Sequence, residues 1–424
     1  MSKIVAWLKK TPLKQIWWKL KKKTPLKQMI RFYSKKREDR FLFHTIPDAY
    51  NARKEEPLDE SKVVFIEIRL PAISNSFRVL YDELEQNYNF NLHTHLLRNS
   101  FVPYKEYAAR CKKMIEDVAT AKYVFVNEAS NVLSSIEPRK ETVITQVWHA
   151  CGAFKKFGKS TAELIFGPNA KQLLRHPNNK NYTHVTVSSP EVVWAYAEAM
   201  DLVGKEGIIK PVGTSRTDIF FREETIKKAF QHLYERMPLA RGKKVILYAP
   251  TFRGRVARAK TPDCLDVKMF AQAFSDDYVL LMKHHPIVKD LPEIPNEYQG
   301  IFAMDVTKTM SIEELLCISD LCISDYSSLV FEYSLFERPM LFYAYDLEEY
   351  FDWRGFYYDY DELTPGPVCK TNEEMIEYIQ NINQNFDKQK VIDFKKKFMS
   401  ACDGQATERI IDLVFGDEAK KYHK

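Results

Sequence analysis

LCISDYSS, residues 321–328, is the stretch that best indicates the fold, because an apolar run ends there in a short polar turn. A helix-like segment follows the turn, and a second apolar run begins after Pro339. Strand, turn, helix and strand in this order are typical of a parallel sheet. The serine pair at this junction places hydroxyls and free N–H groups where a helix dipole favours an anion. Ser327 and Ser328 therefore either cap the helix or bind phosphate.

Strand-like and helix-like segments alternate on both sides of this stretch. The strand-like segments form two series, 62–69, 122–127, 143–148 and 183–188, then 244–249, 278–283, 321–324 and 340–343. Longer helical patterns such as Tyr104–Thr120 and Pro190–Met200 lie between them. This alternation predicts an α/β protein with two Rossmann-like domains, whose parallel sheets face a cleft. We divide the chain into an arm (1–45), a first domain (46–225) and a second domain (226–424).

The bulk composition indicates a folded protein in a reducing compartment. The chain has 424 residues, 45% of them hydrophobic, and this length suffices for two cores. Its 7 cysteines are scattered and form no C-x-x-C pair, which argues against disulfides and zinc. No apolar run approaches the roughly 20 residues that span a bilayer, and the N-terminus is a poor secretion signal. We expect a cytoplasmic protein.

The positive charge belongs to the N-terminal arm. Residues 1–37 hold 13 Lys or Arg and no acidic residue, so the remainder is acidic despite the net charge of +6. The arm repeats KKTPLKQ and sets Trp17, Trp18, Met29 and Phe32 among the lysines. This composition predicts an amphipathic helix on an anionic membrane surface. A nucleic-acid tail or a solvated arm are the alternatives, but large apolar residues contribute nothing to a contact with phosphate alone.

Polar residues follow several of the expected strands. His149 comes directly after the strand 143–148, where a neutral imidazole could accept a proton from a hydroxyl. Thr251 and Arg253 follow the strand 244–249, and Arg253 could clamp an oxyanion with two hydrogen bonds. A structural role is the alternative for each of them.

Three further groups complete the candidate chemistry. Lys283, His284 and His285 follow the strand 278–283 and could bind phosphoryl oxygens, whereas adjacent histidines on an extended chain are a poor metal pair. Arg216 lies in GTSRTD, where it either reaches the cleft or pairs with a loop carboxylate. His93 and His95 have no acidic partner nearby in the sequence, so we predict no metal site there.

The order of these motifs resembles that of a known family. WHACGAFKKFG, GTSRTD, YAPTFRG, KHHP, SDYSS-x₃-E, RP-x₂-FY and RGFYYDY-x₅-PGP span residues 143–367. They are similar to the motifs of the CDP-glycerol glycerophosphotransferases of teichoic acid synthesis. The resemblance implies a GT-B-like pair of Rossmann domains. It also implies transfer of glycerol phosphate or ribitol phosphate from a CDP-alditol to a hydroxyl of a polyprenyl-diphosphate-linked acceptor, with release of CMP.

The resemblance also assigns residue roles. His149 is the implied general base, and Lys283 and His285 match a K-x-H-P pair that handles the diphosphate, with His285 counted as catalytic. The expected substrate-binding residues are Trp148, Ala150, Cys151, Gly152, Arg216, Pro250, Thr251, Arg253, Lys283, His284, Ser327, Ser328 and Glu332. Neither a metal nor another cofactor is expected.

The expected partners are the CDP-alditol, the lipid-linked acceptor and, through residues 1–37, the cytoplasmic face of the membrane. Nucleic acid is not expected, and homo-oligomerisation stays open. The alternative functions are a GT-B nucleotide-sugar glycosyltransferase of envelope polysaccharide synthesis, since the fold serves both chemistries, and a non-catalytic adaptor. The choice between glycerol and ribitol, between one addition and polymerisation, and the identity of the polymer also stay open.

Overall fold

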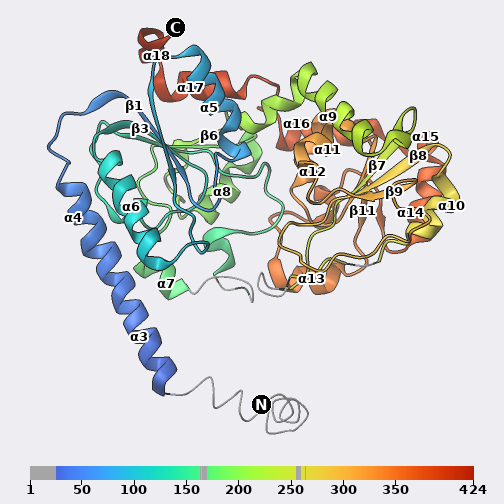
Figure 1. Ribbon diagram of the computed structural model, residues 1–424, viewed down its shortest axis with the longest axis horizontal. Helices are drawn as coiled ribbons and strands as arrows, with labels where there is room; N and C mark the ends of the chain where they lie inside the picture. The colour runs from blue at the N-terminus through green and yellow to red at the C-terminus, as the bar shows by residue number, and fades with distance from the viewer. Residues whose placement is uncertain (1–24, 163, 165–169, 255–258, 263) are drawn as a thin grey trace.

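Two α/β units make up the body of the protein, as the sequence predicts. The computed structural model describes residues 25–424 except 163, 165–169, 255–258 and 263. Each unit has one parallel sheet with helices packed against it (Figure 1). The greater part of the basic repeat, residues 1–24, lies outside the described residues.

The first unit is built on a parallel sheet with the strand order β2-β1-β3-β4-β5-β6. The strands are β1 (Asp59–Glu67), β2 (Asn91–Leu96), β3 (Ala121–Val126), β4 (Val143–Gln146), β5 (His184–Thr186) and β6 (Ile209–Lys210). The second half of β1 and nearly all of β3 are buried on both faces. Continuous apolar runs such as VVFI and YVFV form central parallel strands for this reason.

The second unit repeats this design with the order β12-β11-β10-β7-β8-β9. Its strands are β7 (Lys244–Tyr248), β8 (Tyr278–Met282), β9 (Ala303–Asp305), β10 (Leu321–Ser324), β11 (Met340–Tyr343) and β12 (Val368–Cys369). All eight strands expected from the sequence are present within a few residues. The order reverses between β7 and β10, and ligands bind at such switch points in open α/β sheets.

The α-helices connect and cover these strands. They are α3 (Pro25–Arg40), α4 (Ile46–Asn51), α5 (Asn75–Asn87), α6 (Tyr104–Val118), α7 (Ala170–Arg175), α8 (Val193–Ala199), α9 (Glu223–Arg236), α10 (Val267–Phe274), α11 (Ile312–Ile318), α12 (Leu329–Tyr333), α13 (Leu347–Arg354), α14 (Asn372–Gln380), α15 (Ile382–Asn385), α16 (Lys388–Phe398), α17 (Ala406–Phe415) and α18 (Glu418–Tyr422). A π-helical turn, η1 (Phe41–Thr45), joins α3 to α4, and the 3₁₀ helix η6 (Ser215–Phe221) precedes α9.

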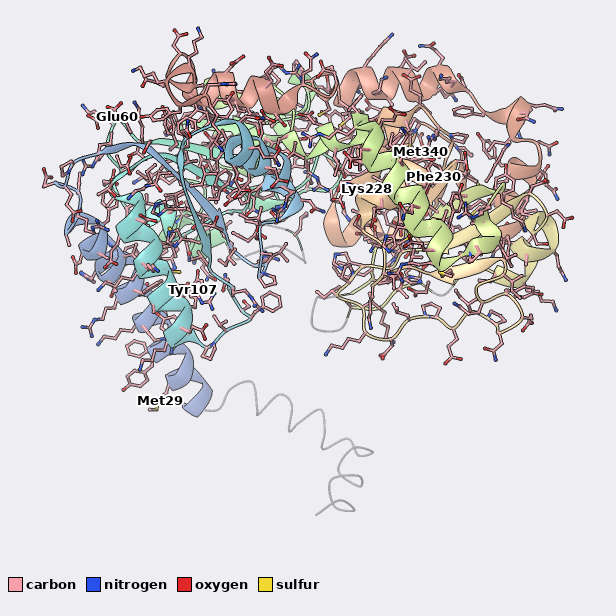
Figure 2. All side chains as sticks on the ribbon, turned by 45° about the horizontal axis from the view of Figure 1, so that its top comes forward. Met29, Glu60, Tyr107, Lys228, Phe230 and Met340 are labelled. Atoms are coloured by element: carbon pink, nitrogen blue, oxygen red, sulfur yellow. The ribbon has the colours of Figure 1, made fainter. Side chains whose placement is uncertain are left out.

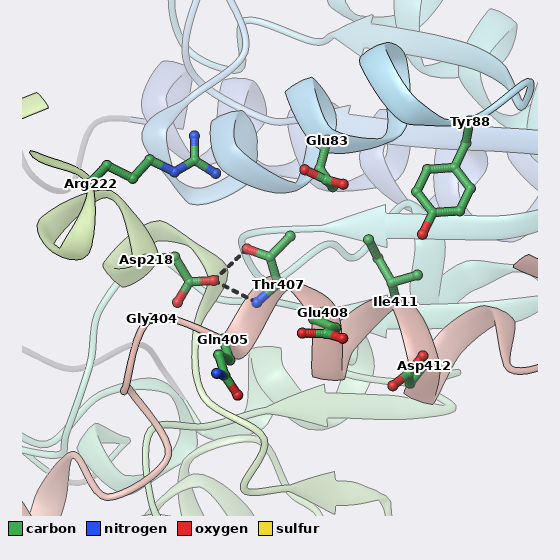
Figure 3. A pocket seen from close by; sticks show the side chains of 10 residues that line it. All are labelled: Glu83, Tyr88, Asp218, Arg222, Gly404, Gln405, Thr407, Glu408, Ile411 and Asp412. Carbon is green, nitrogen blue, oxygen red and sulfur yellow. Dashed lines mark hydrogen bonds between the residues drawn. The ribbon is translucent and has the colours of Figure 1, made fainter. Parts of the chain in front are cut away.

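The C-terminal segment returns to the first unit. Ile410, Ile411 and Phe415 of α17 share a buried cluster with Phe65 of β1 and with β3. The Asp218 carboxylate of η6 accepts hydrogen bonds from the backbone N–H and hydroxyl of Thr407 at 2.7 and 2.6 Å, at the start of α17 (Figure 3). The sequence-based division placed all of 226–424 in the second domain, whereas α17 completes the core of the first.

The described part of the arm projects from the body as helix α3 (Figure 1). Met29 lies at its outer end (Figure 2), and Met29, Phe32 and Tyr33 are 53%, 63% and 63% exposed. Near the body, Asp39 forms an ion pair with Arg175 at 2.6 Å. Among the described residues, no helix combines the length and apolarity needed to cross a bilayer.

Candidate active site

His149 stands in the turn that follows β4. The preceding residue, Trp148, has a φ of 54°, a left-handed conformation that is uncommon for a bulky residue and is often found at functional sites. The backbone N–H of Trp148 donates to Gln146 Oε1 at 2.9 Å, which holds this turn in place. The indole lies 4.3 Å from the imidazole between ring centroids. The strained turn therefore fixes the direction in which the His149 side chain points from the end of the sheet.

A single hydrogen bond sets the protonation pattern of His149. Nδ1 lies 3.1 Å from the backbone oxygen of Asn127, which can only accept, so Nδ1 carries the proton. Nε2 is then the lone-pair nitrogen. The imidazole is accessible to solvent, but the protein atoms around it limit hydration of its charged form, and this desolvation, with a smaller effect from Arg216, lowers its pKa to about 4. Near neutral pH His149 is therefore an uncharged hydrogen-bond acceptor.

A pocket of about 430 Å³ opens beside His149. Loops at the carboxyl ends of β1 and β3 form most of its wall, as expected for an open α/β sheet. It is lined by Glu67, Arg69, Leu70, Pro71, Ala72, Ile73, Ser74, Asn75, Ser76, Asn127, Glu128, His149, Arg216 and Glu313. Only His149 and Arg216 of this set are predicted from the sequence. Apart from Glu313, the missed residues lie in or directly after the motifs FIEIR and VFVN, and their position at the end of a strand was the available signal.

Arg216 joins the two domains beside His149. Its Nη1 donates to the His149 backbone oxygen at 2.6 Å, and its Nη2 donates to Glu313 at 3.2 Å. Its Nε lies 3.0 Å from Glu332 as an ion pair, without good hydrogen-bond geometry. Burial and the like charge of Glu313 raise the pKa of Glu332 in spite of Arg216. The structure thus brings together three predicted groups, His149, Arg216 and Glu332, and adds Glu313.

The rest of the WHACG segment packs against its surroundings. Ala150 accepts a hydrogen bond from the Tyr196 hydroxyl at 3.1 Å through its backbone oxygen. The buried Cys151 thiol lies 3.1 Å from the Thr214 hydroxyl, and its hydrogen bond with Cys402, together with burial, raises its pKa. Gly152 has a φ of 62°, and a Cβ there would lie 2.3 Å from the Phe331 ring of the second domain. Only glycine permits this contact between the domains.

Arg253 lies between two carboxylates of the second domain. It forms ion pairs with Asp325 at 2.9 Å and Asp346 at 2.6 Å. These partners raise its pKa further above the ordinary arginine value, although burial opposes the shift. Asp325 also accepts a hydrogen bond from the Thr251 backbone N–H at 2.9 Å. Thr251 and the buried Pro250 stand just after the end of β7. Arg253 therefore organises the ends of β7 and β10.

The Thr251 side chain differs from the Thr251 backbone in its hydrogen bonding. The side chain is buried, and its oxygen has no hydrogen-bond partner among the described residues. Buried polar groups are normally paired, so a ligand or a bound water is the natural partner for this hydroxyl.

The KHHP segment divides between anchored and exposed side chains. Lys283 Nζ donates to the backbone oxygen of Thr307 at 2.8 Å, and burial lowers its pKa. The fully buried His284 lies 2.7 Å from the Thr261 hydroxyl, which places it in the packing of the domain. His285 is exposed, with its ring 4.9 Å from that of Phe252.

Ser327 and Ser328 stand at the start of the five-residue helix α12. Ser327 Oγ accepts a long hydrogen bond of 3.4 Å from the backbone N–H of Leu329, whereas the Ser328 side chain makes no capping bond. Both serines are half-buried. In the described parts of the chain, no group of three His, Cys, Asp or Glu could hold a metal ion.

Comparison with known proteins supports this architecture. A teichoic acid poly(ribitol-phosphate) polymerase of Bacillus spizizenii is 37% identical over 89% of this chain, which spans 59% of that protein. A ribitol-phosphate primase of the same organism is 34% identical over 84% of this chain and 92% of the relative. A glycerol-phosphate primase of Bacillus subtilis is 27% identical over 84% of this chain and 92% of the relative.

A solved structure shows the same fold. The wall teichoic acid polymerase TagF superposes with a TM-score of 0.73 at 20% identity, over 93% of this chain and 98% of that chain. The family described as CDP-glycerol:poly(glycerophosphate) glycerophosphotransferase matches residues 49–416. This match covers both sheets and every candidate residue discussed above, so the chain belongs to the CDP-glycerol:poly(glycerophosphate) glycerophosphotransferase family.

Proposed function

We propose that this protein transfers an alditol phosphate from a CDP-alditol to a hydroxyl of a polyprenyl-diphosphate-linked acceptor and releases CMP. Family membership supports the class of reaction. The observation that carries the proposal is the neutral His149, whose Nδ1 is engaged by Asn127 and whose Nε2 is left as a base beside a pocket. This arrangement suits proton abstraction from an acceptor hydroxyl.

In the proposed reaction, the acceptor oxygen attacks the phosphorus that carries the alditol while its proton passes to His149 Nε2. The bond between this phosphorus and the oxygen of the CMP phosphate breaks, and CMP leaves with the electron pair. Lys283, anchored by the Thr307 carbonyl, supplies positive charge to the diphosphate, and the exposed His285 supplies a hydrogen-bond donor. The Thr251 hydroxyl and the turn at Ser327 and Ser328 supply further donors.

We propose ribitol as the alditol of the donor. Two relatives whose names specify ribitol phosphate are 37% and 34% identical to this chain, whereas the glycerol-phosphate primase is 27% identical. Product masses test this choice directly. The protein is incubated with CDP-ribitol or CDP-glycerol and a defined lipid-linked acceptor, and the product mass reports both the alditol and the number of additions. CMP release is expected, and release of a nucleoside diphosphate would instead indicate glycosyl transfer.

The arm fits a lipid-linked acceptor. Exposed Met29, Phe32 and Tyr33 lie on the same helix as Lys35, Lys36 and Arg37, a combination that binds anionic membrane interfaces. We propose that residues 1–37 hold the protein peripherally on the cytoplasmic face of the membrane, where the acceptor is presented.

A further inference from the structure

The pocket beside His149 has an anion-favouring end at helix α5. This 13-residue helix has no acidic residue in its first turn. Its N-cap residue, Ser74, makes no side-chain capping bond, because the Ser74 hydroxyl accepts the Asn127 amide at 2.9 Å instead. Ser74, Asn75 and Ser76 all line the pocket. The first-turn N–H groups and the helix dipole therefore favour a negatively charged group there.

Asn127 provides an independent indication of a ligand. Its Nδ2 lies 2.9 Å from Glu67 Oε2, and because a carboxylate can only accept, this contact fixes the orientation of the amide. The amide oxygen, Oδ1, is then left without a partner among the described residues, although Asn127 is only 2% exposed. Buried acceptors of this kind are normally paired, and an O–H or N–H donor from a ligand or a bound water would satisfy this one.

Arg69 lies at the rim of the pocket. Its side chain is 65% exposed, and its Nε contacts Glu128 at 2.7 Å. The remaining guanidinium edge is suited to a phosphate, which arginine binds through two parallel hydrogen bonds. The pocket thus combines a base, a hydroxyl acceptor and two features that attract a phosphate, alongside the carboxylates of Glu67, Glu128 and Glu313.

We infer that this pocket binds the terminal alditol phosphate of the acceptor, an inference that rests on the proposed function. One hydroxyl of the alditol lies at His149 Nε2, and a second hydroxyl donates to Asn127 Oδ1. The phosphate of the same unit contacts Arg69 and the first turn of α5. Glu67 acts as a positioning residue, because it holds the Asn127 amide and accepts the backbone N–H of Leu70 at 3.3 Å.

The first experiment separates acceptor binding from donor binding. Arg69→Gln is expected to raise the acceptor KM about tenfold, the effect of a lost hydrogen bond to a charged group, while the donor KM stays within twofold. Arg78→Gln is the matched control, because Arg78 is exposed on the same helix α5 and does not line the pocket. A raised donor KM with an unchanged acceptor KM would overturn the inference. Absence of CDP-alditol turnover by the unaltered protein would instead overturn the proposed function.

A binding measurement provides a second readout without turnover. Free ribitol 5-phosphate is titrated into the full-length protein and its ligand-observed NMR signals are followed. We expect saturable binding to the unaltered protein and to Arg78→Gln, with at least about tenfold weaker binding to Arg69→Gln and Asn127→Ala. Equal binding by Arg69→Gln and Arg78→Gln would contradict the inference, and Arg69, being exposed, tests it even where Asn127→Ala fails to fold.

Discussion

Arg216 Nη1 donates to the backbone oxygen of His149 at 2.6 Å, while the other nitrogens of the same guanidinium face Glu313 and Glu332. The histidine follows β4 of the first domain, and the two carboxylates lie on α11 and α12 of the second. A single cation therefore fixes the backbone position of His149 relative to the second domain. Its predicted role was donor binding, and the contacts seen here are with protein groups.

Arg216→Met removes the shared cation and leaves Glu313 and Glu332 buried without it. We expect a loss of about 3–5 kcal/mol in unfolding free energy at pH 8, typical of breaking a buried ion pair. Burial raises the pKa of the Glu332 carboxyl, so its charged form destabilises the fold, and the deficit should shrink as the pH falls to 5. Denaturant unfolding at both pH values measures this, with Arg222→Met as the exposed control. Equal deficits at pH 5 and pH 8 would exclude the buried-charge explanation.

His149→Ala should reduce kcat about 10²–10⁴-fold, the usual contribution of a positioned general base. The lowered pKa, about 4, places the basic form in excess throughout the neutral range. For the unaltered protein, kcat/KM should therefore stay level from pH 8 to about pH 5.5 and fall only at lower pH. The pH profile of initial rates tests this, with exposed His44→Ala as control. An acidic limb centred near pH 6.5 would contradict the lowered pKa of His149.

Arg253 is expected to act with Asp346 as one unit. Arg253→Gln and Asp346→Asn each break the same pair, so the two losses of unfolding free energy should not add in the double variant. We expect a coupling of about 1–3 kcal/mol from the double-mutant cycle. Additive losses, combined with a raised donor KM for Arg253→Gln alone, would favour the predicted oxyanion clamp instead.

Asp117 links stability to acid. Its carboxylate lies 2.9 Å from His95 and 3.0 Å from Lys62. Burial alone would raise the pKa of Asp117, but these hydrogen bonds outweigh it and hold the pKa well below its usual range. A depressed pKa gives stability that is present above the ordinary carboxyl pKa near 4 and is lost as the pH falls through the folded value.

Asp117→Asn should therefore cost about 2 kcal/mol at pH 7 and flatten the decline in stability between pH 5 and pH 3. Urea unfolding across this range measures the effect, and Asp82→Asn on the exposed face of α5 serves as control. If the unfolding free energy of Asp117→Asn declines with falling pH as steeply as that of the unaltered protein, other groups govern acid unfolding.

The membrane role of the arm is testable through two lysines. Lys35→Gln with Lys36→Gln should weaken binding to anionic vesicles by about 2 kcal/mol, roughly thirtyfold, at about 1 kcal/mol per cation. Removal of residues 1–37 should abolish sedimentation with anionic vesicles. Undiminished sedimentation after the deletion would count against the arm as the membrane contact.

The sequence predicts the central strands well because they are buried on both faces and read as continuous apolar runs, as in VVFI of β1. It misses β6, β9 and β12, which have 2, 3 and 2 residues and no periodicity to detect. Strand β2 alternates polar residues in NLHTHL at the sheet edge, so its apolar signal is weak. Short and edge strands depend on their neighbours more than on their own composition.

In the site, the position of His149 directly after a strand was sufficient to select it. Arg216 and Glu332 were also predicted, and the structure shows that they contact each other beside His149. Asn127 and Glu313 were missed because their relevance depends on contacts across more than 20 residues. His284 and Lys283 were predicted to bind substrate, but His284 is buried and Lys283 is anchored to a backbone carbonyl. Adjacent residues in one motif therefore face different environments. Sequence spacing identifies the loop but not the direction of each side chain.

Helix α17 has a consequence for biosynthesis. Residues 406–415 supply part of the core of the first domain, yet they emerge from the ribosome after the whole of the second sheet. The domain that begins first is thus completed last, and the apolar groove of Phe90, Tyr123 and Phe125, against which Phe415 packs, stays uncovered while the second domain is synthesised. A nascent chain halted before residue 406 would present that groove to chaperones, whereas the later domain could already be native.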